Sequence, residues 1–126
     1  MNSLSTYLYI AIGGGLGASL RFFISQIMLQ WLGKGFPFGT LLVNVIGSFL
    51  LGLVYSLTEQ GHLEIIPWRT LVAIGFLGAF TTFSTFSLDS LLLLQQGQTM
   101  KGLLNIIFNL FFCLGAAWLG MQIVKG

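Results

Sequence analysis

Apolar residues fill the chain in four long runs, and polar clusters separate these runs. The clusters are a Gly-Lys-Gly turn, a Glu-Gln-Gly-His loop and a Gln-Gln-Gly-Gln loop, at residues 33–35, 59–62 and 95–98. A helix needs roughly 20 apolar residues to cross a bilayer core of about 30 Å. The pattern therefore predicts an all-α membrane protein whose four transmembrane helices form a single domain over residues 1–126. The expected spans are residues 7–32, 37–57, 67–94 and 100–124.

The composition supports a membrane protein and argues against several other classes of protein. Of the 126 residues, 56% are hydrophobic and 6% are charged, whereas soluble domains carry about 25% charged residues. The net charge of +2 comes from too few residues to form a basic patch, so nucleic acid is not an expected partner. Cys113 is the only cysteine, which excludes an intrachain disulfide. The expected surroundings of the protein are the lipid bilayer.

The charges at the ends of the spans do not predict a single orientation in the membrane. Four spans place both termini on the same side. Lys and Arg near span ends favour the cytoplasmic side, but one side has Arg69 and Lys125 and the other has Lys34 and Lys101. Arg21, within the first span, adds only a weak bias. A single orientation and insertion in both directions both fit this count, and the second would let two opposite copies pair as an antiparallel dimer.

The stretch GAFTTFSTFS, which begins at Gly78, is unusually polar for the middle of a span. Because Gly78 is flexible and the hydroxyls of Thr81 and Thr82 compete for backbone hydrogen bonds, the third helix is expected to break near its middle. Such a break is tolerated where the backbone is buried in protein or lines a cavity, and its freed carbonyls suit a hard cation. Phe83 and Phe86 share a helix face, and the positive edges of their rings suit an anion. Packing against lipid or core would explain either ring equally well.

Other polar side chains also lie within the spans, where they usually face a cavity or a partner. Thr40 and Asn44 are one turn apart on the second span, although a lone asparagine in a membrane most often bonds another helix. Asn105, Asn109 and Cys113 recur every four residues and form a polar stripe along the fourth span. This stripe favours a lined track over simple helix association.

Two charged residues, Arg21 and Asp89, lie inside the predicted spans and away from their first turns. Arg21 must snorkel, pair or face water, so it either attracts anions at a pore mouth or anchors a dimer. Asp89, followed by Ser90, is a functional candidate because carboxylates within a membrane are unfavourable. The glycines before Arg21 are not a dinucleotide-binding loop, since no strand precedes them, and their four-residue spacing predicts close helix packing. Hydroxyls, amides and ring edges with few acids are groups that suit a small anion.

Three stretches, GGGLGASLRF, GTLLVNVIGSFLLG and GAFTTFSTF, occur in this order and resemble the Fluc (CrcB) family of fluoride channels. The resemblance covers nearly the whole chain, and the Thr-Thr-Phe-Ser-Thr-Phe run is its most specific part. It implies an antiparallel, dual-topology homodimer with two fluoride pores and a structural sodium ion between the broken third helices. The chain would then be a channel of the bacterial plasma membrane, not an enzyme, and would export fluoride passively and lower its toxicity.

The resemblance also implies roles for single residues. Asn44 is similar to the pore asparagine, and Phe83 and Phe86 are similar to the rings whose edges meet fluoride. The backbone carbonyls of Gly78 and Thr81 are similar to those that bind sodium. The other expected pore residues are Arg21, Thr40, Ser84, Thr85, Asn105 and Asn109. The chain departs from the family in the fourth span, where tyrosine and serine hydroxyls are common, and at Asp89, where glutamate is common.

The alternative is a small proton-coupled multidrug exporter, which also has four short spans. Such exporters carry a glutamate in the first span, but residues 7–32 contain no acid, so Asp89 would have to exchange the protons. A membrane enzyme is not supported, because His62 is the only histidine and neither a nucleophile with its base nor a set of metal ligands is available. The polar stripes disfavour a purely structural subunit.

Overall fold

The computed structural model describes residues 3–61 and 65–125, and every regular element in these residues is a helix. The elements are α1 (Ser3–Leu32), α2 (Phe38–Glu59), the π-helix η1 (Ile65–Leu77), α3 (Gly78–Phe80), α4 (Phe83–Gln95) and α5 (Thr99–Lys125). Four segments are long and apolar enough to cross a membrane: Ser3–Leu32, Phe38–Glu59, Thr70–Gln95 and Thr99–Val124. The prediction of an all-helical protein with four spans is therefore confirmed. The loop residue His62 lies outside the described residues.

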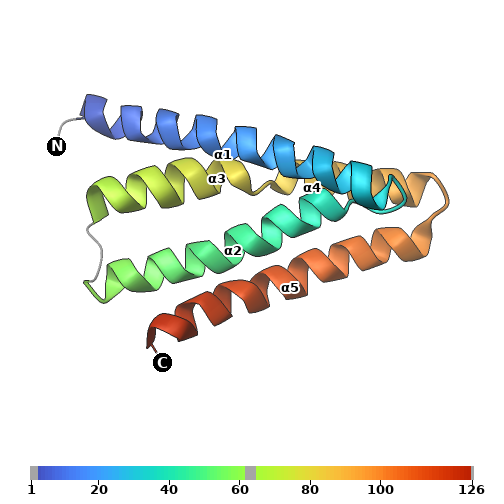
Figure 1. Cartoon of the computed structure of the whole chain (residues 1–126). Coiled ribbons are helices and arrows are strands. Elements are labelled where there is room, and N and C mark those ends of the chain that lie inside the picture. The colour runs from blue at the N-terminus through green and yellow to red at the C-terminus, as the bar shows by residue number, and fades with distance from the viewer. Residues whose placement is uncertain (1–2, 62–64, 126) are drawn as a thin grey trace.

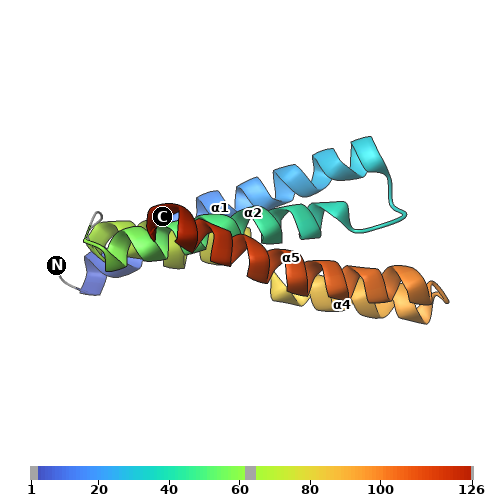
Figure 2. The same cartoon turned by 90° about the horizontal axis from the view of Figure 1, so that it is seen from below.

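The four spans run up and down, and the described chain begins and ends at the same end of the bundle (Figure 1). α2 packs along α5, and α1 packs along η1. At the opposite end the bundle opens, because α1 and α2 diverge there from α4 and α5 (Figure 2). Gly33 and Gly97, with φ of 79° and 81°, follow α1 and α4 at this open end and terminate the two helices.

Glycines allow the helices to approach closely where two spans cross. A Cβ atom on Gly13 or Gly17 of α1 would collide with the backbone of η1, and one on Gly52 of α2 would collide with the carbonyl of Ala117 on α5. The packing role predicted for the glycine-rich stretch is confirmed at Gly13 and Gly17. Gly15 does not share this role, since a Cβ there would have no such neighbour within 4 Å.

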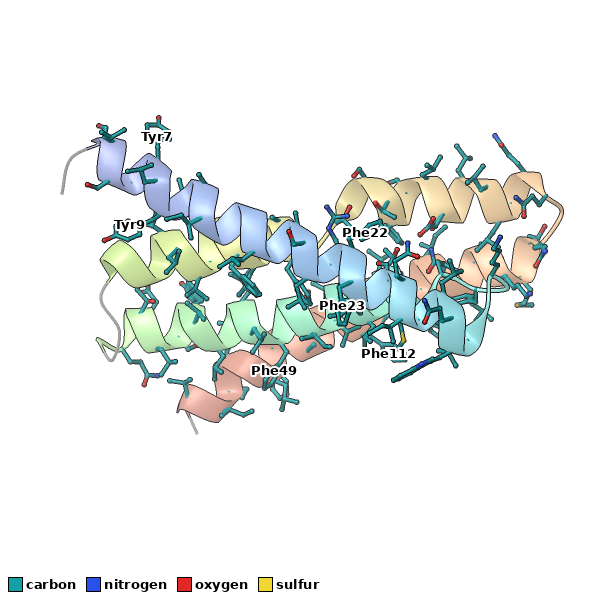
Figure 3. The ribbon with its side chains drawn as sticks, turned by 45° about the horizontal axis from the view of Figure 1, so that its top comes forward. Tyr7, Tyr9, Phe22, Phe23, Phe49 and Phe112 are labelled. Carbon is teal, nitrogen blue, oxygen red and sulfur yellow. The ribbon has the colours of Figure 1, made fainter. Side chains whose placement is uncertain are left out.

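The interior of the bundle holds buried polar side chains beside a small apolar core, and its outer surface carries many large apolar side chains. The buried apolar residues of the described chain are Val43, Leu77, Phe80, Phe86 and Leu93. The buried polar residues are Thr40, Asn44, Ser56, Thr70, Ser90, Asn105 and Asn109. Large apolar side chains such as Trp31 are exposed, and Tyr7 points away from the bundle in Figure 3. This distribution suits lipid surroundings, in which apolar surface is not penalised and polar groups must find partners inside the protein.

Candidate functional site

The third span is interrupted at Thr81 and Thr82, so the predicted break is present. Both residues have extended backbones, with φ −86° and ψ 160° at Thr81 and φ −152° and ψ 123° at Thr82. α4 begins at the next residue, and Thr82 caps it, because its Oγ1 accepts a hydrogen bond of 3.1 Å from Thr85 N. Gly78 itself stays helical. The hydroxyl residues, and not the glycine, therefore form the break.

Asn44 of α2 holds the break through its side chain. Its Oδ1 accepts a hydrogen bond of 2.8 Å from Thr82 N, and its Nδ2 donates one of 3.1 Å to Thr82 O. One carboxamide thus binds both backbone groups of the same residue, as a neighbouring strand would. Because Asn44 is buried, these bonds replace hydration that the broken helix lacks at this depth.

The break also deprives carbonyl groups of their usual helical donors. In a continuous helix, each carbonyl accepts from the N–H four residues later. The carbonyl of Gly78 loses its donor because Thr82 N–H bonds Asn44. The carbonyl of Thr81 loses its donor because Thr85 N–H bonds Thr82 Oγ1. Carbonyl oxygens suit a hard cation, so these two residues fit the sodium role that the resemblance implies.

Side chains offer no alternative metal site in the described part of the chain, where no three His, Cys, Asp or Glu residues gather.

The carbonyl of Ala79 lies between those of Gly78 and Thr81 in the chain and has a side-chain partner. Arg21 Nε of α1 donates a hydrogen bond of 2.9 Å to it. Arg21 lies in the first span, where its guanidinium was expected to snorkel, pair or face water. It finds its partner beside the break in the third span.

Buried amides continue the polar network from Asn44 onto α5. Asn44 Nδ2 donates to Asn109 Oδ1 at 3.0 Å. Asn109 Nδ2 donates to the main-chain carbonyl and to Oδ1 of Asn105, at 2.8 Å and 3.1 Å. Asn105 Nδ2 then donates to Ser90 Oγ of α4 at 2.9 Å. The stripe predicted on the fourth span consequently faces α2 and α4 inside the bundle.

A cavity of about 350 Å³, here called the ring cavity, runs along the break. Phe83 and Phe86 line it with ring centroids 5.4 Å apart and planes inclined by 57°. Phe86 is only 8% exposed, whereas Phe83 is 75% exposed in the single chain. The other residues of the predicted site that line this cavity are Asn44, Gly78, Thr81 and Asn109; Cys113 and Ser48 line it as well.

A second cavity of about 360 Å³, here called the mouth cavity, is lined by residues at the open end of the bundle. Thr40 and Asp89 line it and are joined by a hydrogen bond of 3.0 Å from Thr40 Oγ1 to Asp89 Oδ2. Thr85 and Lys34 line the same cavity. Hydroxyls, a carboxylate and a cation therefore meet where the bundle opens.

The expected pore residues divide among these places. Asn44, Phe83, Phe86 and Asn109 line the ring cavity, and Thr40 and Thr85 line the mouth cavity. Ser84 is exposed and lies 3.2 Å from the Thr82 hydroxyl, measured between their Oγ and Oγ1 atoms. Asn105 is fully buried, and Arg21 lies beside Ala79; neither is among the residues that line the two cavities.

A family model described as "CrcB-like protein, Camphor Resistance (CrcB)" matches residues 8–121, a range that includes the break, Asn44, both rings and the amides of α5. The chain belongs to the CrcB family. The family inferred from the three sequence stretches is thereby confirmed.

CrcB relatives are similar along almost the whole length of the chain. The protein of Pseudoalteromonas translucida (strain TAC 125) named "Fluoride-specific ion channel FluC" is 58% identical over 115 residues, which are 91% of this chain and 96% of the relative. The protein of that name from Shewanella amazonensis (strain ATCC BAA-1098 / SB2B) is 53% identical over 121 residues, covering 96% and 97% of the two chains. That from Vibrio campbellii (strain ATCC BAA-1116) is 48% identical over 124 residues, covering 98% of each.

Two features of this CrcB chain were not predicted from its sequence. The pair of hydrogen bonds between the Asn44 side chain and the Thr82 backbone was not predicted, although the spacing of Thr40 and Asn44 indicated a polar helix face. Ser90 was noted only as the neighbour of Asp89, yet it joins α4 to Asn105. The signal for Ser90 was its position four residues after Phe86, whose carbonyl it bonds at 2.9 Å.

Proposed function

We propose that this chain is a fluoride-specific ion channel that lets fluoride cross the membrane passively. The observation that carries the proposal is the 58% identity, over nearly all of the chain, to a relative named for that activity. The polar interior supports it, because amides, hydroxyls and ring edges bind an anion weakly, as conduction requires. The protein therefore moves an ion and catalyses no reaction.

The two cavities define the proposed route of the ion. Fluoride enters through the mouth cavity, passes the hydroxyls of Thr40 and Thr85, and reaches the ring cavity. There the edges of Phe83 and Phe86 replace part of its hydration, beside the Asn44 amide, whose N–H groups bond Thr82 and Asn109. Fluoride is small and tightly hydrated, so many weak positive contacts let it enter, and no lysine or arginine among the residues that line the ring cavity holds it back.

The working unit in this proposal is a homodimer of oppositely inserted copies. Membrane transporters commonly build a central site from two broken helices in inverted repeats, whereas one chain here supplies one break. A second copy would supply the other, and the carbonyls of Gly78 and Thr81 from both copies would hold a structural sodium ion. The exposed ring of Phe83 supports this arrangement, since a partner would cover it.

The proposed role in the cell follows from the acidity of hydrogen fluoride. The neutral acid crosses bilayers and ionises in the cytoplasm, where the anion is trapped. The relatives are bacterial proteins, and in the plasma membrane of a bacterium the negative potential drives an anion outward with about 2.3 kcal/mol per charge per 100 mV. A channel selective for fluoride thus lowers its concentration in the cell without an energy source of its own.

Anion efflux from liposomes containing the purified protein tests the proposal, with valinomycin present so that potassium balances the charge. Fluoride should leave rapidly and chloride should stay, while liposomes without protein should retain both. Equal efflux of fluoride and chloride would contradict the selectivity. Proton movement driven by a cationic drug, without fluoride efflux, would instead support the proton-coupled exporter with Asp89 as its acid.

A further inference from the structure

The buried polar groups around the break form one continuous series of hydrogen bonds that all point the same way. Each group accepts from the one before it and donates to the next. The series begins at the N-terminal end of α4, crosses to α2 and α5, and returns to α4. Its five bonds are Thr82 N to Asn44 Oδ1 (2.8 Å), Asn44 Nδ2 to Asn109 Oδ1 (3.0 Å), Asn109 Nδ2 to Asn105 Oδ1 (3.1 Å), Asn105 Nδ2 to Ser90 Oγ (2.9 Å) and Ser90 Oγ to Phe86 O (2.9 Å).

The five hydrogen bonds from Thr82 N to Phe86 O are here called the relay, and main-chain groups fix its direction. Thr82 N–H is a donor only, so the atom of Asn44 that faces it must be the amide oxygen, and the Asn44 nitrogen must face Asn109. The Asn105 carbonyl is an acceptor only, so the Asn109 nitrogen must face it at 2.8 Å. Both constraints give Asn109 the same orientation. The amides therefore have one consistent arrangement, and the aligned bonds strengthen one another.

We propose that Asn109, Asn105 and Ser90 are positioning residues for fluoride conduction, and this inference rests on the proposed function. The relay joins the Asn44 carboxamide at one end to the Phe86 backbone at the other. Asn44 and Phe86 both line the ring cavity. The relay thus keeps the Asn44 carboxamide and the Phe86 ring in register along the ring cavity.

Two members of the relay, Ser90 and Asn105, act without contacting the ion. Ser90 and Asn105 are buried, with 5% and 0% of their surfaces exposed, and neither is among the residues that line the two cavities. Substitution of either residue therefore cannot remove a fluoride ligand from the cavities. A change in conduction would have to come through the residues that the relay holds.

The chain offers a matched pair of serines for the experiment. Ser90 and Ser87 lie on α4, and each hydroxyl donates to the carbonyl four residues earlier at 2.9 Å. Ser90 also accepts from Asn105, whereas Ser87 is exposed and has no place in the relay. The variants Ser90→Ala, Ser90→Thr and Ser87→Ala, with Asn105→Leu and the double variant Ser90→Ala/Asn105→Leu, separate the relay from the local bond.

Fluoride efflux from liposomes is measured for each variant as two quantities: the rate in active liposomes and the fraction of liposomes that empty. Ser90→Ala and Asn105→Leu should each lower the rate about tenfold, which is the effect of one buried hydrogen bond. The double variant should be no slower than the slower single variant, because both changes interrupt one series. Ser90→Thr should restore most of the rate, and Ser87→Ala should match the wild type.

Other outcomes would overturn the inference. A wild-type rate in Ser90→Ala, or single losses that multiply in the double variant, would show that these residues do not act in series. A lower fraction of active liposomes at an unchanged rate would show that Ser90 matters only for folding. Absence of fluoride efflux from the wild type would refute the proposed function itself, and the inference with it.

Discussion

Arg21 Nε donates a hydrogen bond of 2.9 Å to the carbonyl oxygen of Ala79, so a cation on α1 closes the end of the helix that stops at the break. In a continuous helix the same carbonyl would accept from the N–H of Phe83. The guanidinium also lies where the helix dipole is negative, which adds a favourable electrostatic interaction. The arginine thereby stabilises an interrupted helix at a depth where water is scarce.

Arg21→Met should destabilise the protein, because it removes the donor and leaves the part-buried carbonyl of Ala79 without this partner. A hydrogen bond to a charged group contributes about 1.5–3 kcal/mol, and the loss should be of that size in denaturant-induced unfolding in detergent. Lys34→Met is the matched control, since Lys34 is exposed at the mouth. Equal stability of the two variants would show that Arg21 does not support the break.

Asn44→Asp should be more damaging than its unchanged shape suggests. The substitution keeps the acceptor for Thr82 N–H but turns the donor into an oxygen that faces the oxygens of Thr82 and Asn109. Stability should fall by at least about 2 kcal/mol, and fluoride efflux should be lost. Gln98→Glu makes the same amide-to-acid change at an exposed position and should alter neither quantity. A stable, conducting Asn44→Asp protein would refute the role given to this amide.

The rings of Phe83 and Phe86 should matter for conduction more than for folding. Isoleucine has similar bulk but no quadrupole, so Phe83→Ile and Phe86→Ile should each lower fluoride efflux by at least about tenfold. Only Phe86→Ile should also lose stability, by about 1 kcal/mol, because Phe86 is the buried ring. Phe111→Ile changes an exposed ring of α5 and serves as the control. Normal efflux in both ring variants would mean that the rings only pack.

Removal of sodium should weaken the proposed dimer. Exhaustive exchange of sodium for N-methylglucamine would leave the carbonyls of Gly78 and Thr81 without a cation, so the dimer should dissociate more readily and fluoride efflux should decline. Cross-linking in detergent and efflux from liposomes measure the two effects. Readdition of sodium should reverse both. If neither quantity changes, a water molecule fills the position instead.

Opposite insertion of the two copies predicts labelling from both sides of the membrane. A cysteine at Lys34, introduced into a Cys113→Ser chain, should react with an impermeant maleimide partly from outside intact vesicles and completely after they are opened. Replacement of Cys113 by serine keeps a polar group beside Ser48. Complete labelling, or complete protection, before the vesicles are opened would show a single orientation.

The sequence predicted the helices and the break well, because both depend on local properties of the chain. Long apolar runs require helices in lipid, and the hydroxyls of Thr81 and Thr82 compete with the helix at the point where it stops. The π-helical course of η1 has no comparable local signal. Close packing of the first span at Gly13 and Gly17 was predicted, but specific side-chain bonds between spans were not. The bond between Thr40 and Asp89 joins residues 49 positions apart, and it depends on how two helices are rotated about their axes.

The opening of the bundle at one end has a consequence for electrical behaviour. In each chain the mouth cavity lies at the end where α1 and α2 diverge from α4 and α5 (Figure 2). In a pair of oppositely inserted copies, one mouth cavity would face each compartment, and a two-fold axis in the plane of the membrane would exchange the two routes. The assembly would then have no preferred direction, and its current at a given voltage should equal in size the current at the opposite voltage when the same fluoride solution bathes both sides.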